Sequence, residues 1–151
     1  MSAMNKPIRW GILGTGLIAA EFAKAMRHVR DAELLSVGSR TQSSASDFAN
    51  AHGIAHAHAS YEALAEDPNV DVVYIATPHT LHFENTLLCL QAGKHVLCEK
   101  PFALNTAQVT DMVIAAREHK LFLMEAMWMR FIPLLRDLQR RLAENEIGEV
   151  K

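Results

Sequence analysis

Cysteine, net charge and long apolar runs are all scarce in this 151-residue sequence, and each scarcity narrows what the protein can be. The two cysteines, Cys89 and Cys98, form no C-x-x-C pair, so neither a disulfide framework nor a thiolate metal site is indicated. A formal net charge of -2 argues against a nucleic-acid partner. No stretch reaches the ~18 apolar residues of a membrane helix. We therefore expect a cytoplasmic protein with reduced thiols and no membrane partner.

The order of apolar segments predicts the fold class. Half of the residues are hydrophobic, which is ordinary globular composition. Apolar runs of strand length alternate with helix-period segments, the pattern of a parallel sheet covered by helices. We expect strands at 8–13, 32–37, near 54, 71–76, 95–98 and 121–124, and helices at 17–28, 43–52, 80–92, 105–119 and 133–145, with a short one after the N-cap Ser60. The sequence thus predicts an α/β fold, a doubly wound parallel sheet of Rossmann type.

A glycine turn lies between the first expected strand and helix. Its sequence, Gly14-Thr15-Gly16-Leu17-Ile18-Ala19, matches the pattern G-x-G-x-x-[GA]. The first glycine allows a tight turn, and the second lets the backbone approach a pyrophosphate. The helix N-terminus then offers free N–H groups to the phosphates. We interpret residues 14–18 as dinucleotide-binding; the alternative is a glycine turn with a purely structural role.

The end of the second strand distinguishes between the two nicotinamide cofactors. An acidic residue there binds the ribose 2′-hydroxyl of NAD and repels the 2′-phosphate of NADP. This sequence has Gly38-Ser39-Arg40-Thr41 instead, with a guanidinium between two hydroxyl side chains. Arginine is well suited to phosphate, so Ser39 and Arg40 favour NADP over NAD. In the alternative, Arg40 is a solvated surface charge and the cofactor is NAD.

Two further strand ends carry polar residues. In open parallel sheets the ligand lies outside the carboxyl ends of the strands. Thr77-Pro78-His79 follows the fourth strand, and Glu99-Lys100-Pro101 follows the fifth. Hydride transfer from an alcohol carbon requires loss of the hydroxyl proton, which the Lys100 amine could take or relay if its surroundings favour the uncharged form. In the alternative, Lys100 only anchors the ribose or a substrate hydroxyl. The Lys100–Pro101 bond is a candidate cis peptide.

Several motifs carry a family resemblance. With the glycine turn, the run Cys98-Glu99-Lys100-Pro101-Phe102-Ala103-Leu104-Asn105 resembles the glucose-fructose oxidoreductase, inositol dehydrogenase and rhizopine-catabolism (Gfo/Idh/MocA) family. The segments 9–12, 60–62 and 124–131 are similar to the branch with dimeric dihydrodiol dehydrogenases and NADP-linked D-xylose dehydrogenases. The resemblance implies that Lys100 is the catalytic lysine and that Glu99 orients it. It also implies that Thr77, His79 and His82 line the nicotinamide side and that Trp128 and Arg130 contact the cofactor.

The resemblance also implies how the chain is organised and what it does. Residues 1–124 would form the dinucleotide-binding domain, and 125–151 a crossover segment and helix leading to an α+β substrate domain that is absent from this sequence. Residues 147–151 resemble the start of that domain, through which the parent enzyme would form a homo-oligomer. The expected enzyme is an NADP-dependent dehydrogenase acting on a sugar, polyol or cyclic diol, and this chain alone would be nearly inactive. The alternative is a non-catalytic NADP-binding module or redox sensor, which would need no lysine at position 100.

Histidines form two groups that raise the question of a metal site. His52, His56 and His58 are close in sequence, as are His79 and His82. No carboxylate or cysteine accompanies either group at a familiar metal-ligand spacing. We expect the first group to lie on the surface and expect no metal site. For the second group, capping or packing is the alternative to substrate contact.

Overall fold

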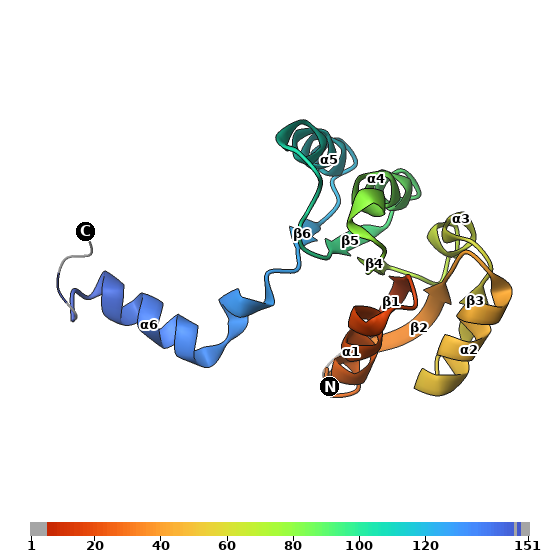
Figure 1. The fold of residues 1–151 in the computed structure, drawn as a ribbon, viewed down its shortest axis with the longest axis horizontal. Helices are drawn as coiled ribbons and strands as arrows, with labels where there is room; N and C mark the ends of the chain where they lie inside the picture. Colours follow the sequence, from red (N-terminus) through yellow and green to blue (C-terminus); the bar gives the residue numbers. More distant parts are fainter. Residues whose placement is uncertain (1–5, 147, 149–151) are drawn as a thin grey trace.

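The computed structural model describes residues 6–146 and 148, and it contains one six-stranded parallel sheet (Figure 1). The strand order is β3-β2-β1-β4-β5-β6, so the chain reverses its direction of travel across the sheet between β3 and β4. The strands are β1 (Ile8–Leu13), β2 (Ala32–Gly38), β3 (His56–His58), β4 (Val72–Ile75), β5 (His95–Cys98) and β6 (Leu123–Glu125). The predicted Rossmann-type sheet is confirmed, and its reversal point lies between β1 and β4.

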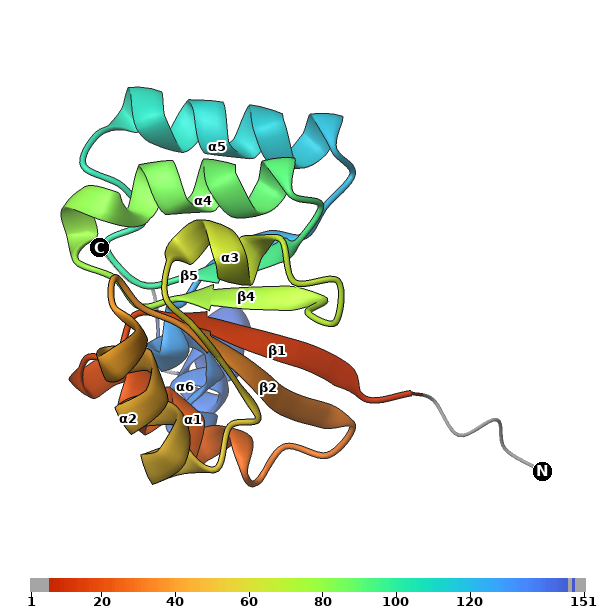
Figure 2. The same cartoon turned by 90° about the vertical axis from the view of Figure 1, so that its right-hand side faces the viewer.

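Helices cover both faces of the sheet. The α-helices are α1 (Leu17–Met26), α2 (Gln42–His52), α3 (Tyr61–Ala65), α4 (His82–Gln91), α5 (Thr106–Glu118) and α6 (Pro133–Ala143). Figure 2 shows α3, α4 and α5 on one face, with α1 and α2 on the other. The helix expected at 80–92 is divided, because residues 79–81 form a 3-10 turn, η1 (His79–Leu81), before α4 begins. The third strand starts at His56 instead of near Ile54, because α2 ends at Gly53 in the left-handed conformation.

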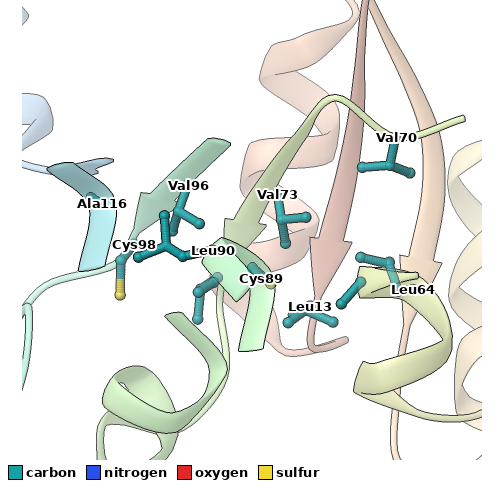
Figure 3. Packing of buried hydrophobic residues seen from close by; sticks show 11 residues of the cluster. Leu13, Leu64, Val70, Val73, Cys89, Leu90, Val96, Cys98 and Ala116 are labelled. Carbon is teal, nitrogen blue, oxygen red and sulfur yellow. The ribbon is translucent and has the colours of Figure 1, made fainter. Parts of the chain in front are cut away.

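Two apolar layers hold the helices to the sheet. Buried strands of a parallel sheet present alternate side chains to opposite faces. On β1, Leu13 packs into the layer under α3, α4 and α5, whereas the preceding Ile12 packs into the layer under α1 and α2. Figure 3 shows the first layer, in which Leu13, Leu64, Val73 and Leu90 converge. This packing fixes where each strand ends, and therefore where the residues that follow it lie.

The chain leaves the sheet after β6. A second 3-10 turn, η2 (Trp128–Phe131), leads to α6, which extends away from the sheet (Figure 1). No residue of α6 is buried, and Leu134 and Leu138 are exposed. The segment 147–151, in which we expect a new domain to start, lies outside the described residues except for Gly148. Among the described residues, no helix combines the length and apolarity that crossing a membrane would take.

Candidate functional site

The glycine turn is held between the ends of three neighbouring strands. Gly14 has φ +99°, and a Cβ atom there would lie 2.8 Å from the carbonyl oxygen of Ala76, so only glycine fits without displacement. Its backbone N–H donates to the carbonyl oxygen of Gly38 at 2.9 Å. The turn is thereby tied to the end of β2 and packed against the end of β4, as the tight-turn interpretation requires.

The second glycine leaves space at the start of α1. Gly16 is the N-cap of α1, and a Cβ atom there would have no neighbour within 4 Å. The first turn of α1 has no acidic residue, and no side chain caps it. Helices α2, α3 and α5 instead begin at Thr41, Ser60 and Asn105, whose side chains accept a backbone N–H. The N-terminus of α1 thus lacks a side-chain cap and has free space beside Gly16, which fits the approach of a pyrophosphate.

A cavity of about 350 Å³ opens beside this turn, and we call it the glycine pocket. It is lined by residues that follow three strands and by the first residue of α3, namely Gly14, Thr15, Gly16, Ser39, Arg40, Ala76, Thr77, Pro78 and Tyr61. Six of these are predicted cofactor-binding residues. Tyr61, Ala76 and Pro78 are the other three, to which the sequence assigned no contact, although Tyr61 lies in one of the resemblance motifs.

Arg40 lies in the lining of the glycine pocket, in the segment that follows β2. Its side chain is exposed, and no carboxylate at the end of β2 competes for it. The neighbouring Ser39 is buried, and its N–H donates to the carbonyl oxygen of His58 at 3.1 Å, which fixes the backbone before Arg40. The second expected hydroxyl is engaged elsewhere, because Thr41 Oγ1 accepts from the Ser44 N–H as the cap of α2.

Thr77 lies at the end of β4, where its hydroxyl accepts a 3.0 Å hydrogen bond from Asn85 Nδ2. His82 is 0% exposed, and its two ring nitrogens lie 3.0 Å from the Thr77 carbonyl oxygen and 2.8 Å from that of Pro101. In this structure the ring of His82 has no exposed surface, and its predicted place on the nicotinamide side stays a prediction. The ring joins the segments that follow β4 and β5, while His79 is exposed on η1.

The Glu99-Lys100-Pro101 segment is fastened through Glu99. This buried carboxylate accepts from the Tyr74 hydroxyl at 2.6 Å and from the Lys100 backbone N–H at 3.0 Å. Burial and the neighbouring Glu99 raise the pKa of Tyr74, so the phenol remains a donor. The Lys100–Pro101 peptide is cis, and the Lys100 side chain is exposed. Glu99 thus orients the backbone of Lys100, and the catalytic role of the lysine amine stays a prediction.

The remaining predicted residues lie around other cavities. Ile18, Glu99 and Trp128 help line a larger, mostly apolar cavity of about 600 Å³ between α1, the sheet and η2. Trp128 is 60% exposed there. Arg130 borders a neighbouring cavity of about 360 Å³ next to Glu125, and Leu17 is exposed on α1. In the described part of the chain, the glycine turn and Arg40 therefore line one pocket. Trp128 and Arg130 line cavities other than the glycine pocket.

A carboxylate from a different segment of the chain lies beside two of the histidines. Asp67, from the loop after α3, lies 3.5 Å from His56 Nδ1 and 3.1 Å from His58 Nε2 through its Oδ2 atom. Burial alone would raise the pKa of Asp67, but hydrogen bonds from the Asn69 backbone, Ser36 and both histidines lower it to about 2. Of these histidines, His56 is exposed, as expected of a surface group, whereas the side chain of His58 is 22% exposed and contacts Asp67.

The chain is similar to a known oxidoreductase family and to solved structures of oxidoreductases. A family model described as "Oxidoreductase family, NAD-binding Rossmann fold" matches residues 8–127. A trans-1,2-dihydrobenzene-1,2-diol dehydrogenase from Sus scrofa is 47% identical over 146 residues, which are 95% of this chain and 44% of that protein. A 3-ketoreductase from Actinomadura kijaniata, solved with TDP-benzene and NADP, has a TM-score of 0.88 at 35% identity and covers 95% of this chain and 45% of the reductase. An NAD binding oxidoreductase from Klebsiella pneumoniae gives 0.88 at 30% identity, over 95% of this chain and 40% of that protein. The chain thus spans less than half the length of each.

Proposed function

The chain belongs to the Gfo/Idh/MocA oxidoreductase family, and from that premise we propose that it is the cofactor-binding part of an NADP-dependent dehydrogenase. The proposed reaction transfers a hydride between the nicotinamide and a carbon that bears a hydroxyl group in a sugar, polyol or cyclic diol. NADP supplies or accepts that hydride when bound. The observation that carries the proposal is the glycine pocket, which joins an uncapped helix N-terminus to Arg40 at the end of β2.

Each part of the pocket suits one part of the cofactor. The N–H groups of α1 would hold the pyrophosphate over Gly16, where no side chain intervenes. Ser39 and Arg40 would hold the 2′-phosphate, because a guanidinium presents several donors to phosphate oxygens. Thr77 and His79, at the end of β4, would lie on the nicotinamide side. The complex of the A. kijaniata reductase with NADP supports the same choice of cofactor.

Lys100 is the residue that we propose for the chemistry. Its amine is exposed at the carboxyl end of β5, and Glu99 holds its backbone in place. From that position it can hydrogen-bond the substrate hydroxyl and relay the proton that leaves during oxidation. The alternative role, as an anchor for the ribose, requires the same position but no proton transfer.

The relatives support the substrate class. The S. scrofa relative is named for a dihydrobenzene diol and the A. kijaniata relative for a ketone. The first name states the dehydrogenation of a diol and the second the reduction of a ketone, and both fit hydride transfer at a carbon that bears oxygen. Because the chain spans 44% of the diol dehydrogenase, residues outside this sequence would contribute to substrate selection and to assembly of the whole enzyme.

A cofactor titration tests the pocket. NADPH and NADH would each be titrated into the chain while tryptophan fluorescence is followed, for the wild type and for Arg40→Ala. Loss of a charged hydrogen-bonding group costs about 1.5–3 kcal/mol, so we expect Arg40→Ala to weaken NADPH binding about 10- to 150-fold and to leave NADH binding nearly unchanged. Arg30→Ala, an exposed arginine after α1, is the matched control. Equal or tighter binding of NADH by the wild type would contradict the proposed preference.

Measuring turnover distinguishes the proposed dehydrogenase from the alternative, a redox sensor. In the complete enzyme, Lys100→Ala should lower kcat by at least about 100-fold, because general acid–base catalysis typically contributes 10²–10⁴-fold. NADPH affinity should change much less. A kcat within a few-fold of the wild type would remove Lys100 from the chemistry and would favour a binding or sensing role. For the 151-residue chain alone we expect NADPH binding with little turnover of any diol or sugar.

A further inference from the structure

We propose that His56, His58 and Asp67 form a binding site for a divalent transition-metal ion of the zinc class. The three residues are the group of potential ligands that the described part of the chain brings together, with their ligand atoms all within 4.8 Å of one another. Two imidazoles and one carboxylate form a common donor set for Zn²⁺. We call these residues the β3 cluster, and it is separate from the glycine pocket.

Two of the three distances within the β3 cluster suit a tetrahedral ion, and the third, between the two imidazole nitrogens, is at most 4.8 Å. Ligand atoms that are about 2.0–2.2 Å from a tetrahedral Zn²⁺ lie about 3.3–3.6 Å from each other. Asp67 Oδ2 lies 3.5 Å from His56 Nδ1 and 3.1 Å from His58 Nε2. Only side-chain adjustments of a few tenths of an ångström are therefore needed at these two edges.

The fold presents these ligands from two segments, the strand β3 and the loop after α3. His56 and His58 are two residues apart on β3, so both side chains project from the same face of the sheet. Asp67 follows α3, which packs against that face, and Lys94 fastens the loop by donating to the carbonyl oxygens of Asp67 and Val70 at 2.6 and 2.8 Å. Ion binding would tie the short edge strand β3 to this loop.

Groups around Asp67 orient it as a ligand. Its Oδ1 atom accepts from the Asn69 N–H at 2.8 Å, and its Oδ2 atom accepts from the buried Ser36 hydroxyl at 3.0 Å. Ser36 is also the register partner of His56 on β2. Hydrogen-bonded carboxylates of this kind are typical of metal sites, where such outer partners sharpen affinity. The Asp67 side chain is 5% exposed, whereas that of His56 is 45% exposed, so the ion could enter from the His56 side and keep a water as its fourth ligand.

Calorimetric titration of ZnCl₂ into the metal-free full chain tests the proposal. We expect one saturable site per chain, with affinity lowered at least about tenfold in His56→Gln and in His58→Gln, and about 10- to 100-fold in Ser36→Ala. His119→Gln is the matched control, because His119 is exposed at the end of α5 and far from this strand in sequence. Co²⁺ absorption in the visible range should show a tetrahedral spectrum in the wild type that is absent in His58→Gln.

Thermal unfolding shows whether a histidine variant has lost a metal ligand or has failed to fold. Without metal, the two histidine variants should keep the circular dichroism spectrum of the wild type. Added Zn²⁺ should raise the unfolding midpoint of the wild type and of His119→Gln, but not that of His58→Gln, because an ion that binds the folded state stabilises it. The proposal is overturned if the wild type shows no saturable site, or if zinc binds both histidine variants with unchanged affinity; the cluster is then a hydrogen-bonded network only.

Discussion

Replacing His82 with phenylalanine would remove the side chain that joins the segments after β4 and β5, while keeping a ring of similar size in the same buried space. The ring nitrogens of His82 lie 2.8 Å from the Pro101 carbonyl oxygen and 3.0 Å from the Thr77 carbonyl oxygen. A carbonyl oxygen only accepts, so a neutral ring can satisfy one of the two and a protonated ring can satisfy both. Phenylalanine can satisfy neither.

The expected loss follows from counting the carbonyl groups that lose a donor. A buried polar group left without a partner costs about 1–3 kcal/mol, so one such group gives a loss of about 1–3 kcal/mol and two give about 2–6 kcal/mol. Domains are typically stable by only about 5–15 kcal/mol. With a urea m-value of about 2 kcal/mol per molar, a loss of about 2 kcal/mol would lower the unfolding midpoint by about 1 M.

Urea unfolding followed by circular dichroism measures this loss. The matched control is His79→Phe, since His79 is an exposed histidine only three positions earlier. Its unfolding free energy should change by no more than about 0.5 kcal/mol. An unchanged midpoint for His82→Phe, with an unchanged m-value, would show that the two carbonyl groups do not depend on this ring and would refute the reasoning.

Two further outcomes follow from the described contacts. Gly14→Ala should destabilise the chain by about 1–3 kcal/mol more than Gly53→Ala, because both glycines have positive φ but only at Gly14 would the new Cβ meet a carbonyl oxygen; urea midpoints that differ by less than their error would contradict this. The side-chain hydrogen bond from Arg9 lowers the pKa of Asp71 below its ordinary value of 3.8, so the stability from this pair is present above that value and is lost as the pH falls below it. Unfolding free energies measured from pH 6 to pH 2 should therefore fall less steeply for Asp71→Asn than for the wild type, and parallel curves would exclude this contribution.

Most secondary structure was predictable because it depends on local patterns. The limits of β1 and β5 match their apolar runs, and Ser60 caps α3 as its position before a short helical segment indicates. The errors lie where local patterns compete. The apolar Ile54 suggested a strand, but its side chain packs beneath α2, and β3 starts only two residues later. The helix expected from Thr80 begins as a 3-10 turn, so α4 starts at His82.

The candidate site was predictable to the extent that its residues form motifs. The glycine turn and Arg40 meet in one pocket because the carboxyl ends of β1 and β2 are neighbours in the sheet. The roles of Asn85 and Asp67 were not predictable, because each acts on a residue supplied by another element. Asn85 donates to Thr77 across the start of α4, and Asp67 reaches β3 from the loop after α3. The burial of His82 was not predictable either. The residues next to it in sequence do not show that its ring lies between two carbonyl oxygens.

By itself the sequence determined the alternation of strands and helices, the glycine turn and the absence of a carboxylate after the second strand. These features depend on residue type, spacing and backbone conformation, which are local. Only the tertiary structure decided which polar groups face each other. It placed Glu99 under Tyr74, turned His82 inward and brought Asp67 to the histidines of β3. Such pairings depend on how distant segments pack across the sheet. The hydrophobic pattern that drives this packing does not specify which polar side chains will meet.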